Sequence, residues 1–105
     1  MIKTPENLGY EYGLQNFDNP NVVQQIFFIK KEPVSKGSTE MKVVQDGTTN
    51  EELIKVSIDR LGILHAKFPS VETLNAITKL QEALMWLYER TQDRLDRGVE
   101  GTHQA

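Results

Sequence analysis

Two arginines and a tryptophan recur on one edge of a strongly helical stretch near the end of the chain. From Thr73 to Gly98 the apolar residues follow helical spacing, which predicts one long amphipathic helix. Steps of three and four residues run up one edge of this helix, which we call the arginine edge: Lys79, Ala83, Trp86, Arg90, Arg94 and Arg97. Arg90 and Arg94 are like charges one turn apart, which costs an isolated helix about 0.2–0.5 kcal/mol. A bound anion would offset this repulsion, but acidic neighbours on a solvated face would do so as well.

The residue types on the arginine edge suit a phosphorylated aromatic ligand. Each guanidinium can present a planar fork to phosphate oxygens, and Trp86 offers a face on which a base can stack. The start of the same helix, at 70–73, has free backbone N–H groups that also favour anions. About 20 residues separate that start from Arg90, or roughly 30 Å of helix. One chain therefore cannot bring both ends onto one small ligand, whereas two antiparallel copies can.

Catalytic and metal chemistry are poorly represented. The chain has no cysteine and two histidines, His65 and His103, and neither lies in a recognisable catalytic motif. The pair Glu51–Glu52 is explained by helix capping, and Asp93 with Asp96 by pairing with nearby arginines. We therefore expect no enzyme activity, no cofactor and no metal site.

The length, charge and hydrophobic pattern of the chain exclude some classes of binding partner. The 105 residues suit one domain, 1–105. A net charge of −3 argues against binding to a nucleic-acid polymer. No apolar run approaches the length of a membrane span and no signal-peptide pattern is present, so we expect no membrane partner.

The first 47 residues predict an arm followed by a small β region. Residues 1–21 are rich in Gly, Pro and Asn, and their three aromatics, Tyr10, Tyr12 and Phe17, are expected to pack on the body. The alternative is an arm that reaches a neighbouring subunit or covers a pocket. Residues 22–32 and 39–45 predict two strands that pair as a hairpin.

The remaining residues, 48–105, predict a helical hairpin with a short tail. A helix over 50–67 follows a capping box at Thr49, and Gly62 within it suggests the close approach of another helix. Pro69 ends this helix and Ser70 begins the next. A short link between two such helices implies an antiparallel pair. The apolar arc of the second helix contains Ile77, Leu80, Leu84, Leu87, Tyr88 and Leu95. The fold class is thus α+β: a small antiparallel β region followed by an antiparallel two-helix hairpin, in an oligomer.

Three segments of this chain resemble a known family: NEELIKVSIDRL, KFP and AITKLQEALMWLYERTQDRLDRGVEGT. They are similar to the helical hairpin domain shared by phage anti-Thoeris and anti-CBASS signal sponges, most closely the first anti-Thoeris class. The resemblance covers 48–105 well and the first 47 residues only in outline. It implies a viral protein of the host cytoplasm that holds cyclic nucleotide-type immune messengers, notably glycosylic cyclic ADP-ribose isomers, without cleaving them. It also implies a dimer or a hexamer with pockets between subunits.

The resemblance further implies roles for single residues. Arg90 and Arg94 fall where the family grips phosphate. At the start of the second helix, where the family often has Cys-Arg-Glu-Asn-Ser, this chain reads Ser-Val-Glu-Thr-Leu, so that only Glu72 is kept. We expect Thr73 to read a polar edge of the ligand and Phe68 to stack on a base.

Two further side chains complete the candidate set, and two other functions remain open. Trp86 is a second stacking residue, and Arg60 on the first helix is a weaker candidate ligand. One alternative is a structural oligomerisation module of a phage accessory protein with no small-molecule ligand. A hydrolase of the same messengers is disfavoured because no nucleophile or metal set is present.

Overall fold

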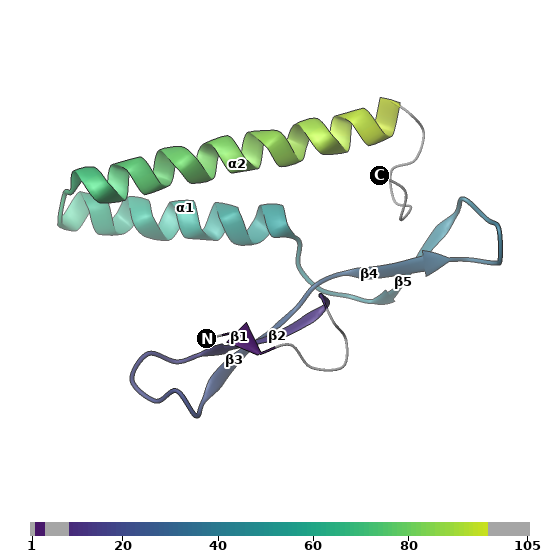
Figure 1. Ribbon diagram of the computed structural model, residues 1–105, viewed down its shortest axis with the longest axis horizontal. Helices are drawn as coiled ribbons and strands as arrows, with labels where there is room; N and C mark the ends of the chain where they lie inside the picture. The colour runs from purple at the N-terminus through teal and green to yellow at the C-terminus, as the bar shows by residue number, and fades with distance from the viewer. Residues whose placement is uncertain (1, 4–8, 97–105) are drawn as a thin grey trace. The chain divides into compact units, whose positions relative to one another are not determined.

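The fold is α+β, as the sequence predicts. The computed structural model describes residues 2–3 and 9–96. Its elements are, in order, β1 (Ile2–Lys3), β2 (Glu11–Gln15), β3 (Val23–Phe27), β4 (Lys30–Pro33), β5 (Met41–Gln45), α1 (Asn50–Lys67) and α2 (Val71–Asp96) (Figure 1). The chain divides into two compact units, residues 1–49 and 50–105. The first unit holds the strands and the second holds the helical hairpin; a single domain over 1–105 stays a prediction from chain length.

The predicted loop-rich arm contains strands. β1 and β2 lie within residues 1–21, and β1, β2 and β3 form an antiparallel sheet in that order. Within this sheet Glu11 of β2 pairs with Phe27 of β3, and Gln15 pairs with Val23. The expectation of a loop was wrong because β2 depends on a long-range partner strand, which the Gly-rich composition of the arm does not reveal.

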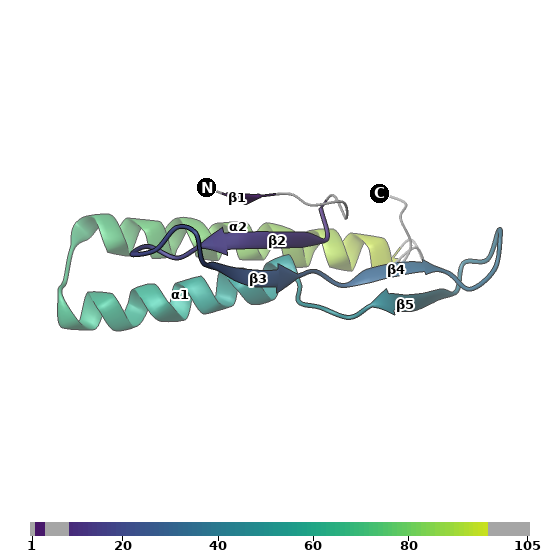
Figure 2. The same cartoon turned by 90° about the horizontal axis from the view of Figure 1, so that it is seen from below.

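The predicted single strand over 22–32 is two strands with different partners. β3 ends at Phe27 and pairs with β2, whereas β4 begins at Lys30 and pairs with β5 (Figure 2). Between them the Phe28 N–H donates to the Tyr10 carbonyl at 2.8 Å, and the Ile29 N–H donates to the Thr48 carbonyl at 3.0 Å. The two backbone N–H groups at the break are therefore hydrogen-bonded although neither belongs to a strand. The predicted β4–β5 hairpin is confirmed, with Pro33 opposite Met41.

Gln45 and Gly47 allow the strands of this unit to lie close to one another. Gln45 Nε2 donates to the carbonyls of Phe28 at 3.1 Å and Tyr10 at 3.3 Å, so that it links β5 to the other sheet. A Cβ added at Gly47 would lie 2.7 Å from the carbonyl carbons of Phe27 and Phe28, which leaves room for glycine only. The chain can thus pass directly over the end of β3 on its way to α1.

The aromatics of the arm divide into packed and exposed side chains. The Tyr12 ring meets the Phe28 ring edge-on at 5.7 Å, and Lys30 Nζ lies 5.1 Å from the centroid of Tyr10. These contacts confirm that Tyr10 and Tyr12 pack on the β unit. Phe17 is fully exposed, so the same expectation was wrong for it.

The helical hairpin begins and ends its helices where the sequence predicts, as far as it is described. α1 covers 50–67, and the Phe68 N–H donates to the Leu64 carbonyl at its end. Ser70 caps α2, since its Oγ accepts the Thr73 N–H at 3.0 Å. The predicted end of α2 at Gly98 lies outside the described residues.

The helices meet along one stripe each. In α2 the half-buried residues recur every three or four positions: Thr73, Ile77, Leu80, Leu84, Leu87 and Thr91, with Ala83 and Arg94 beside them. The corresponding α1 stripe contains Ile54, Ile58, Leu61 and His65. No described residue of either helix is buried. A Cβ at Gly62 would meet no atom of the described residues within 4 Å, so the expected close approach at this glycine does not occur among residues 2–3 and 9–96.

Candidate functional site

The arginine edge lies on one side of α2 and is only partly exposed, since Ala83 and Arg94 are half-buried. Trp86 is 69% exposed, Arg90 is exposed and Arg94 is half-buried. They follow each other at four-residue steps, one turn apart. α2 has 26 residues and α1 has 18, so that the last turns of α2 extend past the start of α1 (Figure 1). Arg90 and Arg94 lie near this protruding end of the hairpin.

The guanidinium of Arg90 is available to a ligand. Within the described residues no hydrogen bond or ion pair engages Arg90. One of its acidic neighbours, Asp96, accepts a hydrogen bond from Gln92 Nε2 at 3.0 Å. Lys79, lower on the same edge, pairs with Glu82 at 3.6 Å. Neutralisation by acidic neighbours thus explains Lys79 but not Arg90.

The second group of candidate residues lies at the tip of the hairpin, where α1 turns into α2. Phe68 is 76% exposed. Ser70 Oγ lies 2.8 Å from Thr73 Oγ1 while it accepts the Thr73 N–H, and the Ser70 N–H donates to His65 Nδ1 at 3.2 Å. His65 therefore has a structural part here, as the acceptor that holds the turn. A small apolar hollow of about 200 Å³ adjoins the tip, lined by His65, Pro69, Ser70, Val71 and Leu74.

The candidate residues therefore form two groups at opposite ends of one hairpin. α2 is continuous from Val71 to Asp96, and at 1.5 Å per residue Thr73 and Arg90 are about 26 Å apart. Arg90 and Arg94, with Trp86 one turn nearer the middle of α2, form the end group, and Phe68 and Thr73 form the tip group. Arg60 is exposed near the middle of α1 and belongs to neither group. No single chain assembles a complete site from these six residues.

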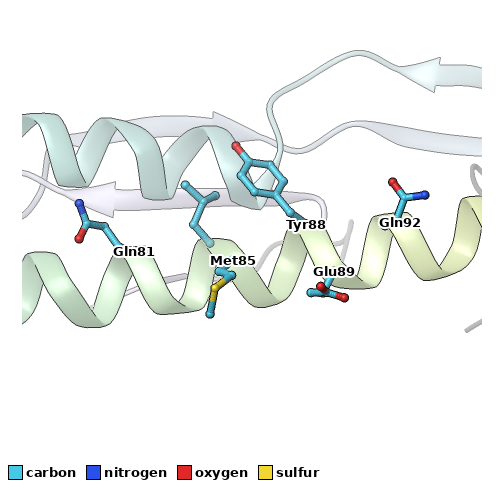
Figure 3. A pocket seen from close by; sticks show the side chains of 6 residues that line it. Gln81, Met85, Tyr88, Glu89 and Gln92 are labelled. Carbon is cyan, nitrogen blue, oxygen red and sulfur yellow. The ribbon is translucent and has the colours of Figure 1, made fainter.

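A third feature, which the sequence analysis missed, lies on the opposite side of α2 from the arginine edge. A hollow of about 430 Å³ is lined by Gln81, Leu84, Met85, Tyr88, Glu89 and Gln92 (Figure 3). Tyr88 was expected in the apolar arc with Leu95, but they are 47% and 54% exposed. The sequence contains a pattern that could have revealed this hollow: Gln81, Met85 and Gln92 recur at helical spacing beside the apolar arc.

One contact links the hollow to α1. Lys55 Nζ lies 5.8 Å from the centroid of the Tyr88 ring, and Figure 3 shows Tyr88 pointing away from the side on which Met85 and Glu89 lie. Hydrogen bonding with the Tyr88 side chain, the charge of Tyr88 and the nearby Glu52 raise the pKa of Lys55 above its usual value. Lys55 therefore stays charged over the whole physiological range.

The described residues contain neither a metal-binding cluster nor a membrane-spanning helix. Among residues 2–3 and 9–96, no group of three or more His, Asp or Glu side chains is placed to hold a metal ion. Neither described helix has a stretch apolar and long enough to span a bilayer.

Comparison with known proteins identifies the family. The family model described as the Acb2/Tad1 hairpin domain matches residues 31–92, from β4 to the last turns of α2. This match covers more than half of the chain, which therefore belongs to the Acb2/Tad1 hairpin domain family. The resemblance inferred from the hairpin segments is thereby confirmed.

A phage protein is similar in sequence to this chain. The chain is 52% identical over 60 residues to a protein named Thoeris anti-defense 1 from Bacillus phage SBSphiJ7. The match covers 56% of this chain and 42% of that protein, so the chain spans less than half of the relative's length.

Proposed function

We propose that this protein is a phage anti-defence protein that binds and sequesters a cyclic nucleotide-type immune messenger without cleaving it. A phage protein named Thoeris anti-defense 1, which is 52% identical to this chain over 60 residues, supports the biological role. Glycosylic cyclic ADP-ribose isomers are the expected messengers, and cyclic oligonucleotides are the alternative. Such a protein would act in the cytoplasm of the infected host.

The observation that carries the proposal is the Arg90 guanidinium, which no described residue engages, one turn from an exposed indole. An exposed arginine with no partner among the residues that the structure describes can form bidentate, charge-assisted hydrogen bonds with phosphate oxygens. Trp86 is 69% exposed and can stack on an adenine face. Arg94, a turn further along, would add a second cation to the same phosphates.

The tip group would supply the rest of the pocket from a neighbouring copy. Phe68 would stack on a base, and the Thr73 hydroxyl, held beside Ser70 Oγ, would hydrogen-bond a polar edge of the ligand. Because about 26 Å separates the two groups in one chain, the pocket needs an oligomer in which the tip of one copy meets the end of another. Arg60 would contribute only if that neighbour lies along the middle of α1.

The groups at these sites support binding rather than turnover. Arginine, indole, phenyl and hydroxyl groups can enclose and neutralise a phosphorylated ligand. None of these four groups is a general base at neutral pH, and the nearby His65 uses Nδ1 to accept the Ser70 N–H. The messenger is therefore expected to leave the protein chemically unchanged.

Retention and release of a messenger test this function. The protein is incubated with cyclic ADP-ribose isomers and cyclic oligonucleotides, washed, and heated, and the supernatant is analysed by mass spectrometry. Intact ligand from the wild-type chain and none from Arg90→Ala is the expected result. Lys36→Ala, an exposed cation of the β4–β5 turn, is the matched control and should retain ligand. Chemically altered ligand would show an enzyme.

One observation favours a second function, a structural oligomerisation module. No described residue of α1 or α2 is buried, so that the hairpin is built to pack on other surfaces. In that case Trp86 is an interface residue and the arginines are solvated. An oligomer that retains none of the messengers would establish this function and exclude the sponge.

A further inference from the structure

We propose that Asp46 is a site of spontaneous covalent modification, at which the bond to Gly47 moves from the main-chain carboxyl group to the side-chain carboxyl group and gives isoaspartate. Asp46 follows β5 directly and is exposed to water. It is also the one aspartate of the chain that precedes a glycine. The inference does not depend on any ligand.

The reacting groups already lie in contact. The Gly47 N–H donates to Asp46 Oδ1 at 2.9 Å, so the carboxyl carbon lies beside the nitrogen that would attack it. Groups held in this way react more readily than groups that must first find each other. Gly47 has no side chain to hinder the approach, and among the described residues its N–H has no other acceptor. The attack therefore breaks no hydrogen bond of a strand or helix.

Three other aspartates of the chain lack this arrangement. Asp59 and Asp93 lie inside α1 and α2, where the nitrogen of the following residue donates to a helix carbonyl. Asp18 is exposed in the loop after β2, but Asn19 follows it and its side chain hinders the approach. Asp46 is therefore expected to react before these three.

The reaction needs water and no other reagent. The Gly47 nitrogen attacks Asp46 Cγ and gives up its proton, the carboxyl group loses an oxygen as water, and a five-membered succinimide closes. Water then adds to one of the two ring carbonyls and cleaves its bond to nitrogen. Cleavage at the side-chain carbonyl restores aspartate. Cleavage at the main-chain carbonyl leaves Gly47 bonded through Cγ, which is isoaspartate, and the composition of the chain is unchanged.

Isoaspartate would disturb the β unit where its backbone segments lie closest, because it adds a methylene group to the main chain just before Gly47. Even an added Cβ at Gly47 would lie 2.7 Å from the carbonyl carbons of Phe27 and Phe28. The next residue, Thr48, donates its N–H to the Phe27 carbonyl at 2.8 Å and accepts the Ile29 N–H at 3.0 Å. Both hydrogen bonds should weaken when Gly47 shifts. The hairpin helices contain none of these groups and should stay intact.

Incubation of the folded chain in water enriched in heavy oxygen tests the reaction. Samples are digested over time, analysed by mass spectrometry, and treated with an isoaspartyl methyltransferase, which labels isoaspartate but not aspartate. The peptide with Asp46 should gain one heavy oxygen and a methyl label, well ahead of the peptide with Asp18. Labelling of Asp46 no faster than that of Asp18 would overturn the proposal. So would labelling of Asp46 that occurs in urea but not in the folded chain.

Two substitutions at position 46 test the ring and its consequence. Asp46→Asn closes the same succinimide with loss of ammonia and should reach isoaspartate sooner than the wild type. Asp46→Glu keeps the carboxylate but would need a six-membered ring, and should give no methyl label. After equal incubation, the Ile29 and Thr48 amides should exchange faster in the wild type but not in Asp46→Glu, with the hairpin amides unchanged in both. Equal methyl labelling of the wild type and Asp46→Glu, or unchanged exchange in the isomerised chain, would contradict the inference.

Discussion

Lys55 of α1 and Tyr88 of α2 contact each other across the hairpin although 33 residues separate them in the chain, with Nζ 5.8 Å from the ring centroid. This contact sets the height of one helix against the other. The first turns of α1 therefore lie beside α2 near Tyr88, and the Arg94 end of α2 extends past the start of α1 (Figure 1).

The pKa of Lys55 depends on its contact with Tyr88. Tyr88→Phe removes the phenol hydroxyl that raises the pKa of Lys55, so we expect that pKa to fall toward its usual value. The folded-state pKa lies above the unfolded one. The contact therefore stabilises the folded chain fully below about pH 10 and stops doing so as the pH rises through the folded-state pKa. NMR titration of the lysine side-chain resonances measures the shift, and an unchanged Lys55 pKa in Tyr88→Phe would show that the phenol is not its cause.

Ser70 is expected to stabilise α2 as its N-cap. Ser70→Ala removes the Oγ that accepts the Thr73 N–H, and should lower the free energy of unfolding by about 1 kcal/mol. Urea unfolding followed by circular dichroism measures this loss. Ser57→Ala, at an exposed position inside α1, is the control and should be neutral or slightly stabilising. Equal stability of the two variants would rule out a capping role.

Gly47 is expected to tolerate no side chain. Ala at this position would push a methyl group against the backbone of Phe27 and Phe28, at an expected cost of about 1–3 kcal/mol. The loss should appear in the β unit, as faster amide hydrogen exchange in β3 and β5. Thr39→Ala, at an exposed loop position, serves as the comparison. Unchanged exchange in Gly47→Ala would mean that the close approach is not maintained in solution.

The planar shape of the Arg90 guanidinium is expected to contribute to messenger affinity in addition to its charge. Arg90→Ala should weaken messenger binding by roughly 10- to 100-fold, because a charge-assisted hydrogen bond contributes about 1.5–3 kcal/mol. Arg90→Lys keeps the charge but not the bidentate fork and should recover only part of the affinity. Isothermal titration calorimetry gives both values. Full recovery by lysine would show a simple charge effect, and no effect of alanine would remove Arg90 from the site.

Much of the helical hairpin could be predicted from local chemistry. The bounds of α1 and the start of α2 follow from Thr49, Pro69 and Ser70, because caps and prolines act on the residues beside them. The arginine edge follows from three- and four-residue spacing, which any helix imposes on its surface. The predicted α+β class needed no more than these periodicities.

The tertiary structure decided which residues pair and which face is covered. The break between Phe27 and Lys30 exists because β3 and β4 pair with different strands, and β2 forms because β3 lies beside it. Tyr88 is spaced like a core residue, yet it lies at the margin because α1 occupies a narrower stripe of α2. Strand pairing and helix packing join residues far apart in the chain, so local spacing does not specify them.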